Sequence, residues 1–492
     1  MNARIAKLGT GLLALYLLLF GWLNWVQVGW AQRLNDDPNN SRALVRDFDR
    51  PRGQILTADG VVLAQSVASQ PGDRFEFQRQ YPTGDLFAHV TGFFNFSFGS
   101  DGAEREFNDD LAGETNALQY QSISDLFVDR ERVGDVTLTL RNDVQQVARD
   151  ALGQQRGSVV ALDPRTGAIL AMWSFPSYDP NPLSVHDQAA ADAARAALDP
   201  TSQQSALIPA SYRRSFPPGS TFKVVTGAIG VNDFGVTDTQ PSYPVEQSFD
   251  IDFTDNELSN FSGETCGGPF PEILRVSCNS GFAHMGVETI GEGGMVLGAE
   301  RFGFNARPPL DLPAPAASTF PTTFPDDEGN GPLARASIGQ GDTRATPLQM
   351  AMVAGAIANG GVMMTPHVLD RVTDDRGEVV RQFQPSVMGE PISPASAATV
   401  EQAMIGVVQR GTGTNARIQG VTVGGKTGTA QVGSDPPSSH AWFICFAGPE
   451  GQAATVAVAV LVEAQPGVSE VTGGRVAAPI ARDVVEAVLA TQ

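Results

Sequence analysis

The first thirty residues restrict the fold more than any other stretch, because they are largely apolar from Leu8 to Trp30. A run of this length matches one membrane-spanning helix, which needs about 20 residues. A cleaved signal peptide is the alternative, but its apolar region is usually only roughly 7–15 residues long and is followed by a small-residue cleavage site. We therefore expect residues 1–30 to be a retained signal anchor. Arg4 and Lys7 before the run place its start in the cytoplasm and the bulk of the chain outside.

The acidic charge balance limits the partners that the chain can bind. The formal net charge is -21 and the isoelectric point is about 4.6, whereas binding to phosphates requires clustered Lys and Arg. The five histidines show no HxxH or HExxH spacing. We therefore expect no nucleic-acid partner, no metal site and no cofactor.

Three cysteines lie in the part of the chain expected to be exported, where disulfides persist. Cys266 and Cys278 are separated by a loop rich in Gly and Pro, so a bridge between them and two free thiols are both open interpretations. Cys445 lies in the strand-like segment AWFICFAG, which favours a buried free thiol.

The chain divides into an N-terminal module at 31–145 and a large domain at 146–492. The module begins with RPRGQILTADGVVLAQS, which predicts two short strands around an Ala-Asp-Gly turn. The large domain begins with two strands in GSVVALDPRTGAILAMWS and ends with three strand-like runs and a final helix. Thr346 and Pro347 are suited to begin a helix between these strands, and 310–332 reads as a long surface loop.

This order of elements predicts an α+β domain. Its sheet would be assembled from both ends of the domain, with helices inserted in the middle of the chain.

Lysine is rare in this chain, and its rarity identifies candidate functional positions. Of the 33 basic residues, only Lys7, Lys223 and Lys426 are lysines. Arg effectively never loses its proton, whereas a buried Lys can. The membrane flank accounts for Lys7. Lys223 and Lys426 therefore mark positions where a compact or deprotonatable ammonium is required.

Ser220 and Lys223 stand at a predicted helix start, because Pro217, Pro218 and Gly219 cannot extend a helix backwards. Residues three apart on a helix share a face. The partial positive charge of a helix N-terminus stabilises a serine alkoxide and disfavours a charged lysine. The pair thus fits a nucleophile with its base. The alternative is that Ser220 only caps the helix and Lys223 is a surface charge.

A second polar group follows strand-like residues near the C-terminus. An ammonium from Lys426 and hydroxyls from Thr427 and Thr429 would suit a substrate carboxylate, and Gly428 leaves room for a ligand against the strand. An ordinary strand with a polar face is the alternative interpretation.

A third candidate lies in VSCNSG, where Ser277 and Asn279 alternate around Cys278. In an extended stretch or a tight loop, Ser277 and Asn279 point the same way and Cys278 faces behind them. A hydroxyl and an amide can relay a proton and hold a peptide group. An ordinary Ser/Asn turn is the alternative.

The motifs S-x-x-K, S-x-N and K-T-G occur in the order found in penicillin-binding proteins and serine β-lactamases. The sequence resembles the class B penicillin-binding proteins and looks most like the actinobacterial penicillin-binding protein A group. The resemblance extends over the whole chain through the anchor and the segments RGQI, YPTGDLFAHVTGF, LTLRNDVQQVARDAL, GSVVALDPRTGAILAMWSFPSYDPN, FPPGSTFK, SCN, IGQGDTRATPLQMA, KTGTA and HAWF. It implies a transpeptidase domain with an antiparallel sheet and helices on both sides.

The resemblance also implies a peptidoglycan D,D-transpeptidase that β-lactams inhibit. By carry-over, Ser220 attacks the penultimate D-Ala carbonyl of a stem peptide and Lys223 takes its proton. Ser277 relays a proton to the leaving amine with help from Lys426, while Asn279 holds the acyl amide.

The remaining motif residues would then bind the substrate. Thr427 and Thr429 would meet the terminal carboxylate at the Gly428 strand, and the backbone N–H groups of Ser220 and Thr429 would form the oxyanion hole.

The expected partners are stem peptides and β-lactams, with a glycosyltransferase of the cell-wall or division machinery supplying the glycan strands. The short module leaves no room for a polymerising domain, so the expected role is cross-linking in cell division or septation. A D,D-carboxypeptidase, a β-lactamase and a non-catalytic β-lactam-binding scaffold stay open as alternatives, because the motifs alone do not separate them.

Overall fold

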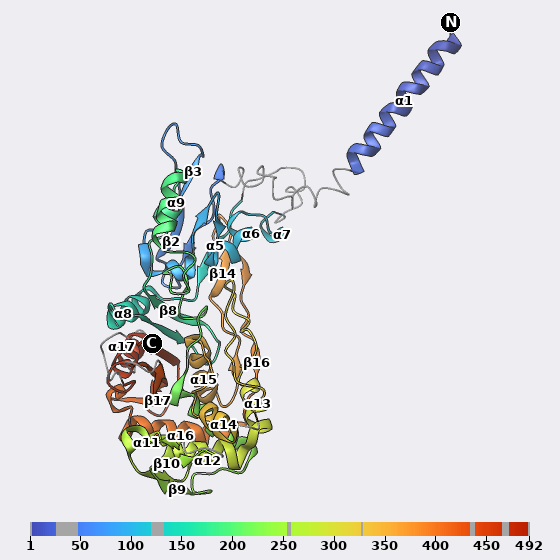
Figure 1. Cartoon of the computed structure of the whole chain (residues 1–492). Coiled ribbons are helices and arrows are strands. Elements are labelled where there is room, and N and C mark those ends of the chain that lie inside the picture. The colour runs from blue at the N-terminus through green and yellow to red at the C-terminus, as the bar shows by residue number, and fades with distance from the viewer. Residues whose placement is uncertain are drawn as a thin grey trace.

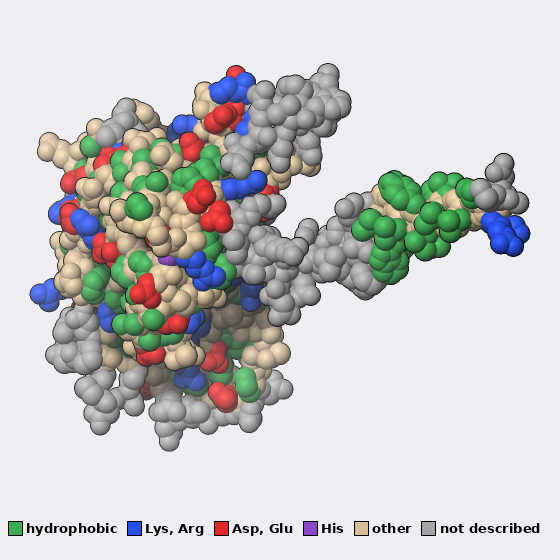
Figure 2. All heavy atoms as spheres, turned by 90° about the horizontal axis from the view of Figure 1, so that it is seen from above, with side chains coloured by type: hydrophobic (Ala, Val, Ile, Leu, Met, Phe, Trp, Pro, Cys, Tyr) green, Lys and Arg blue, Asp and Glu red, His purple; other side chains and the backbone are tan. Residues whose placement is uncertain are grey.

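The structure is a computed structural model, and its N-terminal helix α1 (Asn2–Asn24) stands clear of the rest of the chain (Figure 1). The stretch Arg4–Asn24 has a mean hydropathy of 1.6 and none of it is buried, so it is long and apolar enough to cross a membrane. Figure 2 shows apolar side chains along this helix and basic ones near its start. Residues 26–30 of the predicted anchor lie outside the described residues. The structure describes residues 2–25, 48–119, 132–252, 257–325, 328–432, 438–464 and 472–490.

The large domain is built on a five-stranded antiparallel sheet in the order β17-β18-β19-β7-β8. Strand β19 pairs with β7, so the sheet joins the two ends of the domain, as predicted. The β7 and β19 residues are all buried, which explains their continuous runs of Val, Ala and Leu. The strands are β7 (Gly157–Leu162), β8 (Ile169–Phe175), β17 (Val421–Val432), β18 (Ser438–Pro449) and β19 (Val456–Val462).

Helices cover both faces of this sheet (Figure 1). Helices α8 (Asn142–Leu152) and α17 (Ala477–Leu489) pack together on one face, and α15 (Pro347–Ala358) and α16 (Pro394–Arg410) lie on the other. The hydroxyl of Thr346 accepts a hydrogen bond from the Gln349 N–H at 3.0 Å, so Thr346 caps α15 as predicted. The predicted α+β architecture is confirmed.

Helix α10 (Lys223–Asp233) lies inside the helical half of the domain, directly after the short helix η5 (Gly219–Phe222). A Cβ atom at Gly227 would lie 2.3 Å from the Phe270 ring, so this glycine lets α10 and α11 pack closely. The other elements of this half are β9 (Tyr243–Glu246), β10 (Ser248–Asp250), β11 (Glu257–Ser259), η6 (Phe261–Gly263), β12 (Cys266–Gly268), α11 (Phe270–Val276), α12 (Asn279–His284), η7 (Met285–Ile290), α13 (Gly291–Arg301), α14 (Gly331–Ser337) and η9 (Thr414–Ala416).

The N-terminal module contains a six-stranded sheet in the order β15-β14-β6-β1-β2-β3. Strands β14 and β15 come from inside the range that the sequence assigned to the large domain, so the chain returns to this sheet after building most of the helices. The residue-145 boundary is therefore not a boundary of the sheet. The strands are β1 (Ile55–Leu56), β2 (Val62–Ala68), β3 (Phe77–Gln80), β6 (Asp135–Leu138), β14 (Leu369–Thr373) and β15 (Val379–Gln382).

A buried carboxylate holds the module together. Glu104 is fully buried and forms ion pairs with Arg52 at 3.2 Å and with Arg79 at 2.5 Å. The Tyr81 hydroxyl also donates a hydrogen bond to this carboxylate at 3.2 Å. The remaining short elements of the chain are η2 (Gly84–Leu86), α4 (Ala88–Thr91), β4 (Phe94–Asn95), β5 (Gly99–Ser100), α5 (Gly102–Glu106), α6 (Asn108–Leu111), α7 (Asn116–Gln119), η4 (Asn181–Leu183), α9 (Gln188–Ala197), β13 (Met363–Met364) and β16 (Val387–Gly389).

The surface-loop prediction for 310–332 is right for only part of that segment, since residues 310–320 are mostly buried or half-buried whereas most of residues 321–325 are exposed. Its Phe320 is 2% exposed and stacks on Phe222 of η5, with the ring centroids 5.4 Å apart. The carboxylate of Asp311 accepts hydrogen bonds from the backbone N–H groups of Val368 and Leu369. The first part of the segment thus packs into the core, with Phe320 against η5.

Candidate active site

Ser220 lies in η5, at the helix start that the sequence predicted. Gly219 has a φ of +53°, which glycine adopts without strain, and its N–H donates to the Gly339 carbonyl at 2.9 Å. On the other side, the Trp442 indole donates to the Pro217 carbonyl at 2.9 Å. The side chain of Ser220 caps neither η5 nor α10. The interpretation of Ser220 as a simple helix cap therefore does not hold.

Lys223 is fully buried, so it is not a surface charge. Its Nζ donates to the Ser277 carbonyl and to Asn279 Oδ1, both at 2.7 Å, and lies 3.4 Å from Ser277 Oγ. The Phe282 ring lies beside the amine, with Nζ 5.5 Å from its centroid. In the described part of the chain no hydrogen bond joins Lys223 Nζ to Ser220 Oγ. The first and second motifs thus meet at this amine.

Lys426 approaches the same serine from strand β17. It is also fully buried, and its Nζ donates to Ser277 Oγ at 2.8 Å and to the Thr427 carbonyl at 2.9 Å. The hydroxyl of Ser277 therefore lies between the two amines. The structure brings all three motifs together at this point.

The environment of the two lysines favours their neutral forms. Burial, followed by the nearby charge of Lys426, holds the pKa of Lys223 well below its ordinary value. Burial lowers the pKa of Lys426 to about 7. Their hydrogen bonds go to serine, asparagine and backbone oxygens, and neither pairs with a carboxylate among the described residues. An amine in such a site can accept a proton near neutral pH.

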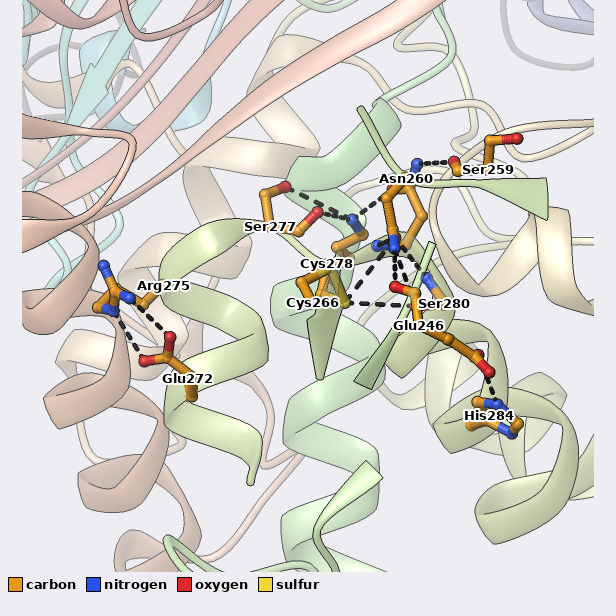
Figure 3. The surroundings of a disulfide bond; sticks show 12 residues. Glu246, Ser259, Asn260, Cys266, Glu272, Arg275, Ser277, Cys278, Ser280 and His284 are labelled. Atoms are coloured by element: carbon orange, nitrogen blue, oxygen red, sulfur yellow. Dashed lines mark hydrogen bonds and ion pairs between the residues drawn. A yellow bond between two sulfur atoms is a disulfide. The ribbon is translucent and has the colours of Figure 1, made fainter. Parts of the chain in front are cut away.

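Ser277 occupies a turn between two helices. It has a φ of +64°, a left-handed conformation that is uncommon for serine, at the end of α11, and Asn279 begins α12. Cys278 between them is 1% exposed and forms a disulfide with Cys266 (Figure 3). Ser277 and Asn279 face Lys223 while Cys278 points away from it, as the alternation in the sequence predicted.

Strand β17 forms the edge of its sheet beside η5. The hydroxyls of Thr427 and Thr412 lie 2.6 Å apart, and Thr429 is half-buried. A Cβ atom at Gly428 would lie 2.9 Å from both the Pro218 carbonyl oxygen and a methyl carbon of Thr221. The glycine therefore lets β17 pack against the start of η5, while a ligand added along the edge of β17 stays a prediction.

Two residues near the site lie outside the predicted motifs. Asn260 lies beside the turn at Ser277, and Thr412 contacts the hydroxyl of Thr427. Both occur in polar turn sequences that resemble many others in the chain, so no local pattern distinguished them.

The remaining candidates for chemistry are the free thiol of Cys445 and side chains that could bind a metal ion. Cys445 is a buried free thiol, as predicted, and burial raises its pKa to about 12. Among the described residues, no group of three or more His, Cys, Asp or Glu side chains is placed to hold a metal ion.

Comparison with known proteins identifies the family. Residues 157–486 match the family profile described as the penicillin-binding protein transpeptidase domain, which covers more than half of the chain. The chain belongs to the penicillin-binding protein transpeptidase family. Residues 52–136 of this penicillin-binding protein also match the penicillin-binding protein A dimerisation domain.

Relatives and solved structures agree with this assignment. The chain is 38% identical to the peptidoglycan D,D-transpeptidase PbpA of Mycolicibacterium smegmatis and 36% identical to PbpA of Mycobacterium tuberculosis, over 99% of each chain. It superposes on M. tuberculosis penicillin-binding protein A in its imipenem acyl-enzyme complex with a TM-score of 0.80 at 35% identity, covering 90% of this chain and 99% of that one. The penicillin G acyl-enzyme complex gives 0.79, again at 35% identity, covering 90% of this chain and all of the other. The predicted resemblance and fold class are confirmed.

Proposed function

We propose that this penicillin-binding protein is a peptidoglycan D,D-transpeptidase that cross-links stem peptides in cell-wall synthesis and is acylated by β-lactams. The observation that carries the proposal is the meeting of two buried, proton-poor amines, Lys223 and Lys426, at the hydroxyl of Ser277. The relatives named for this activity, and the acylated structures with the same fold, support it.

In the acylation step, Ser220 Oγ bonds to the carbonyl carbon of the penultimate D-Ala, and its proton passes to the neutral amine of Lys223. The C–N bond to the terminal D-Ala breaks, and the leaving nitrogen takes a proton through Ser277, which Lys426 holds in place. An acyl-enzyme and free D-Ala result.

In the transfer step, the amine of a second stem peptide bonds to the acyl carbon. The ester bond to Ser220 Oγ breaks, the serine regains a proton, and the amine gives one up to the lysine and serine relay. The product is a cross-link between two stem peptides, and no external energy source is needed because one amide replaces another.

Substrate binding fits the edge position of β17. An extended peptide can add to an unpaired strand edge, with its terminal carboxylate at Thr427 and Thr429. We propose that Asn279 holds the acyl amide. The N–H of Ser220 lies at the start of η5, where helical N–H groups lack partners, and we propose that it binds the developing oxyanion together with the N–H of Thr429.

The anchoring helix supports a membrane location. We propose that Arg4 and Lys7 keep the start of α1 in the cytoplasm and that the catalytic domain works on the outer side. We further propose that a glycosyltransferase of the cell-wall or division machinery supplies the glycan strands.

Fluorescent penicillin provides the test. The wild-type protein should form a covalent adduct, and Ser220→Ala should not. The matched control Ser215→Ala, which changes an exposed serine five positions earlier, should label like the wild type. An unlabelled wild-type protein would refute the proposal. A donor peptide ending in D-Ala-D-Ala, given with an amine acceptor, should yield dimers; hydrolysed donor alone would indicate a carboxypeptidase.

A further inference from the structure

The helix that carries Asn279 has no cap of its own. Cys278 occupies the N-cap position of α12 and contributes no side-chain hydrogen bond. The first N–H groups of a helix have no partner inside the helix and need one from elsewhere. Here the N–H groups of Asn279 and Ser280 both donate to Oδ1 of Asn260, at 2.8 and 2.9 Å. The cap thus comes from a residue 19 positions earlier in the chain.

The other end of the Asn260 side chain is also fixed (Figure 3). Its Nδ2 donates to the Glu246 carbonyl at 2.9 Å and to Ser280 Oγ at 3.1 Å. Asn260 is 4% exposed, so all four hydrogen bonds are sheltered from water. Turning the amide over would set its NH₂ group against two N–H donors, so the partners allow one orientation. A buried amide with every contact satisfied holds its neighbours rigidly.

The same short segment also holds the side chain of Asn279. Its Nδ2 donates to the carbonyl of Ser259 at 2.8 Å, which leaves Oδ1 pointing at Lys223. Backbone and side chain of Asn279 are therefore fixed by two consecutive residues, Ser259 and Asn260. The disulfide at Cys278 ties the turn to β12 but makes no contact of this kind with the Asn279 amide.

We propose that Asn260 is a positioning residue for the D,D-transpeptidase reaction, which holds Asn279 and the adjoining Ser277 turn against Lys223. The inference rests on the proposed function, since it concerns the same site. Asn260 acts through Asn279 and touches no reacting atom.

Asn95 offers a matched control. It is 2% exposed, its Oδ1 accepts two backbone N–H groups, from Ser97 and Phe98, and its Nδ2 donates to the Leu183 carbonyl. Its hydrogen bonds thus resemble those of Asn260, but it lies in the N-terminal module. Asn95→Ala and Asn260→Ala should cost similar stability, while only the second should disturb the site.

The experiment measures the rate constant of acylation by a fluorescent penicillin as a function of pH on the full chain. A rate constant does not depend on how much of the sample is folded. Asn260→Ala should lower it on the order of 10- to 100-fold, the effect of misplacing a reacting group. Asn95→Ala should stay within about threefold of the wild type. Asn260→Asp keeps the acceptor for both N–H groups but sets a carboxylate oxygen against the Glu246 carbonyl, so its rate constant should fall between those of the wild type and Asn260→Ala.

The pH profile of acylation distinguishes a positioning role of Asn260 from a general loss of stability. The charged group that faces Lys223 from the neighbouring elements is Lys426. An ammonium gains more than a neutral amine from the Asn279 oxygen. Displacing Asn279 should therefore move the acid limb of the profile to lower pH in Asn260→Ala and leave it in place in Asn95→Ala.

The possible outcomes test the positioning role of Asn260 and the proposed transpeptidase function separately. Equal rate constants and limbs for Asn260→Ala and Asn95→Ala would overturn the positioning role while labelling of the wild type still supports the transpeptidase. If Asn260→Ala yields no folded protein, the pair Asn260→Asp and Asn95→Asp decides: a rate constant lowered at least tenfold in Asn260→Asp alone supports the role, and equal rate constants in the two variants overturn it. An unlabelled wild type would instead reject the proposed function.

Discussion

Replacing Lys223 by Arg keeps a long basic side chain at the site but removes the ability to lose a proton. In the structure Lys223 is fully buried, donates to Ser277 and Asn279, and faces the amine of Lys426. Burial and the like charge lower the pKa of Lys223, whereas a guanidinium stays charged at any working pH. The variant therefore has no base to receive the proton of Ser220.

The size of the effect follows from that missing base. A positioned general base contributes about 10²- to 10⁴-fold to a rate, so the acylation rate constant of Lys223→Arg should fall by at least about 100-fold. The larger guanidinium also overfills a closed site, at a cost of about 1–3 kcal/mol in unfolding free energy. Stopped-flow or gel-based labelling with fluorescent penicillin measures the first quantity, and urea denaturation measures the second.

Lys7→Arg supplies the control, since it makes the same change at the membrane flank and should label like the wild type. Acylation of folded Lys223→Arg within about tenfold of the wild type would refute the reasoning. The proton of Ser220 would then go to another group, and the scarcity of lysine in this chain would lose its mechanistic meaning.

Two further predictions concern stability. Burial lowers the pKa of Lys426 to about 7, against about 10.4 in an unfolded chain, so the unfolded state binds more protons between these values. The free energy of unfolding should therefore rise with pH from about 7 to about 10, and Lys426→Met should flatten that rise in urea denaturation; an unchanged slope would count against a buried neutral amine. Glu104→Ala leaves the buried guanidinium groups of Arg52 and Arg79 without their carboxylate and should cost about 3–5 kcal/mol. Asp150→Ala, which breaks an exposed ion pair, should cost at most about 1 kcal/mol, and similar melting temperatures for the two variants would contradict this account.

Sequence reasoning succeeded where local chemistry decides the structure. Pro217, Pro218 and Gly219 force a helix to begin near Ser220 whatever surrounds them, and continuous apolar runs predict buried strands. The lysine census identified Lys223 because a residue that is rare in a chain is easy to notice.

Features that depend on distant partners could not be predicted. Strands β14 and β15 join a sheet whose first strand lies roughly three hundred residues earlier in the chain. No local sequence pattern encodes which distant strands they pair with. Asn260 acquires its importance only once α12 folds against it. The segment 310–332 has the composition of a loop, and the burial of Phe320 depends on its contact with Phe222 of η5. The sequence indicated that a residue without a side chain matters at Gly428, but its packing against Pro218 depends on the tertiary structure.

The pairing of β19 with β7 also governs the order in which this chain can fold. β7 ends at Leu162 and its partner β19 begins at Val456, so a chain emerging from its N-terminus must wait for nearly all of its residues before the central sheet can close. Contacts between such distant segments form slowly because a long loop must first be closed. The outer location that we propose for the catalytic domain requires the chain to cross the membrane as an extended thread, and this delay would keep the sheet from closing before that passage.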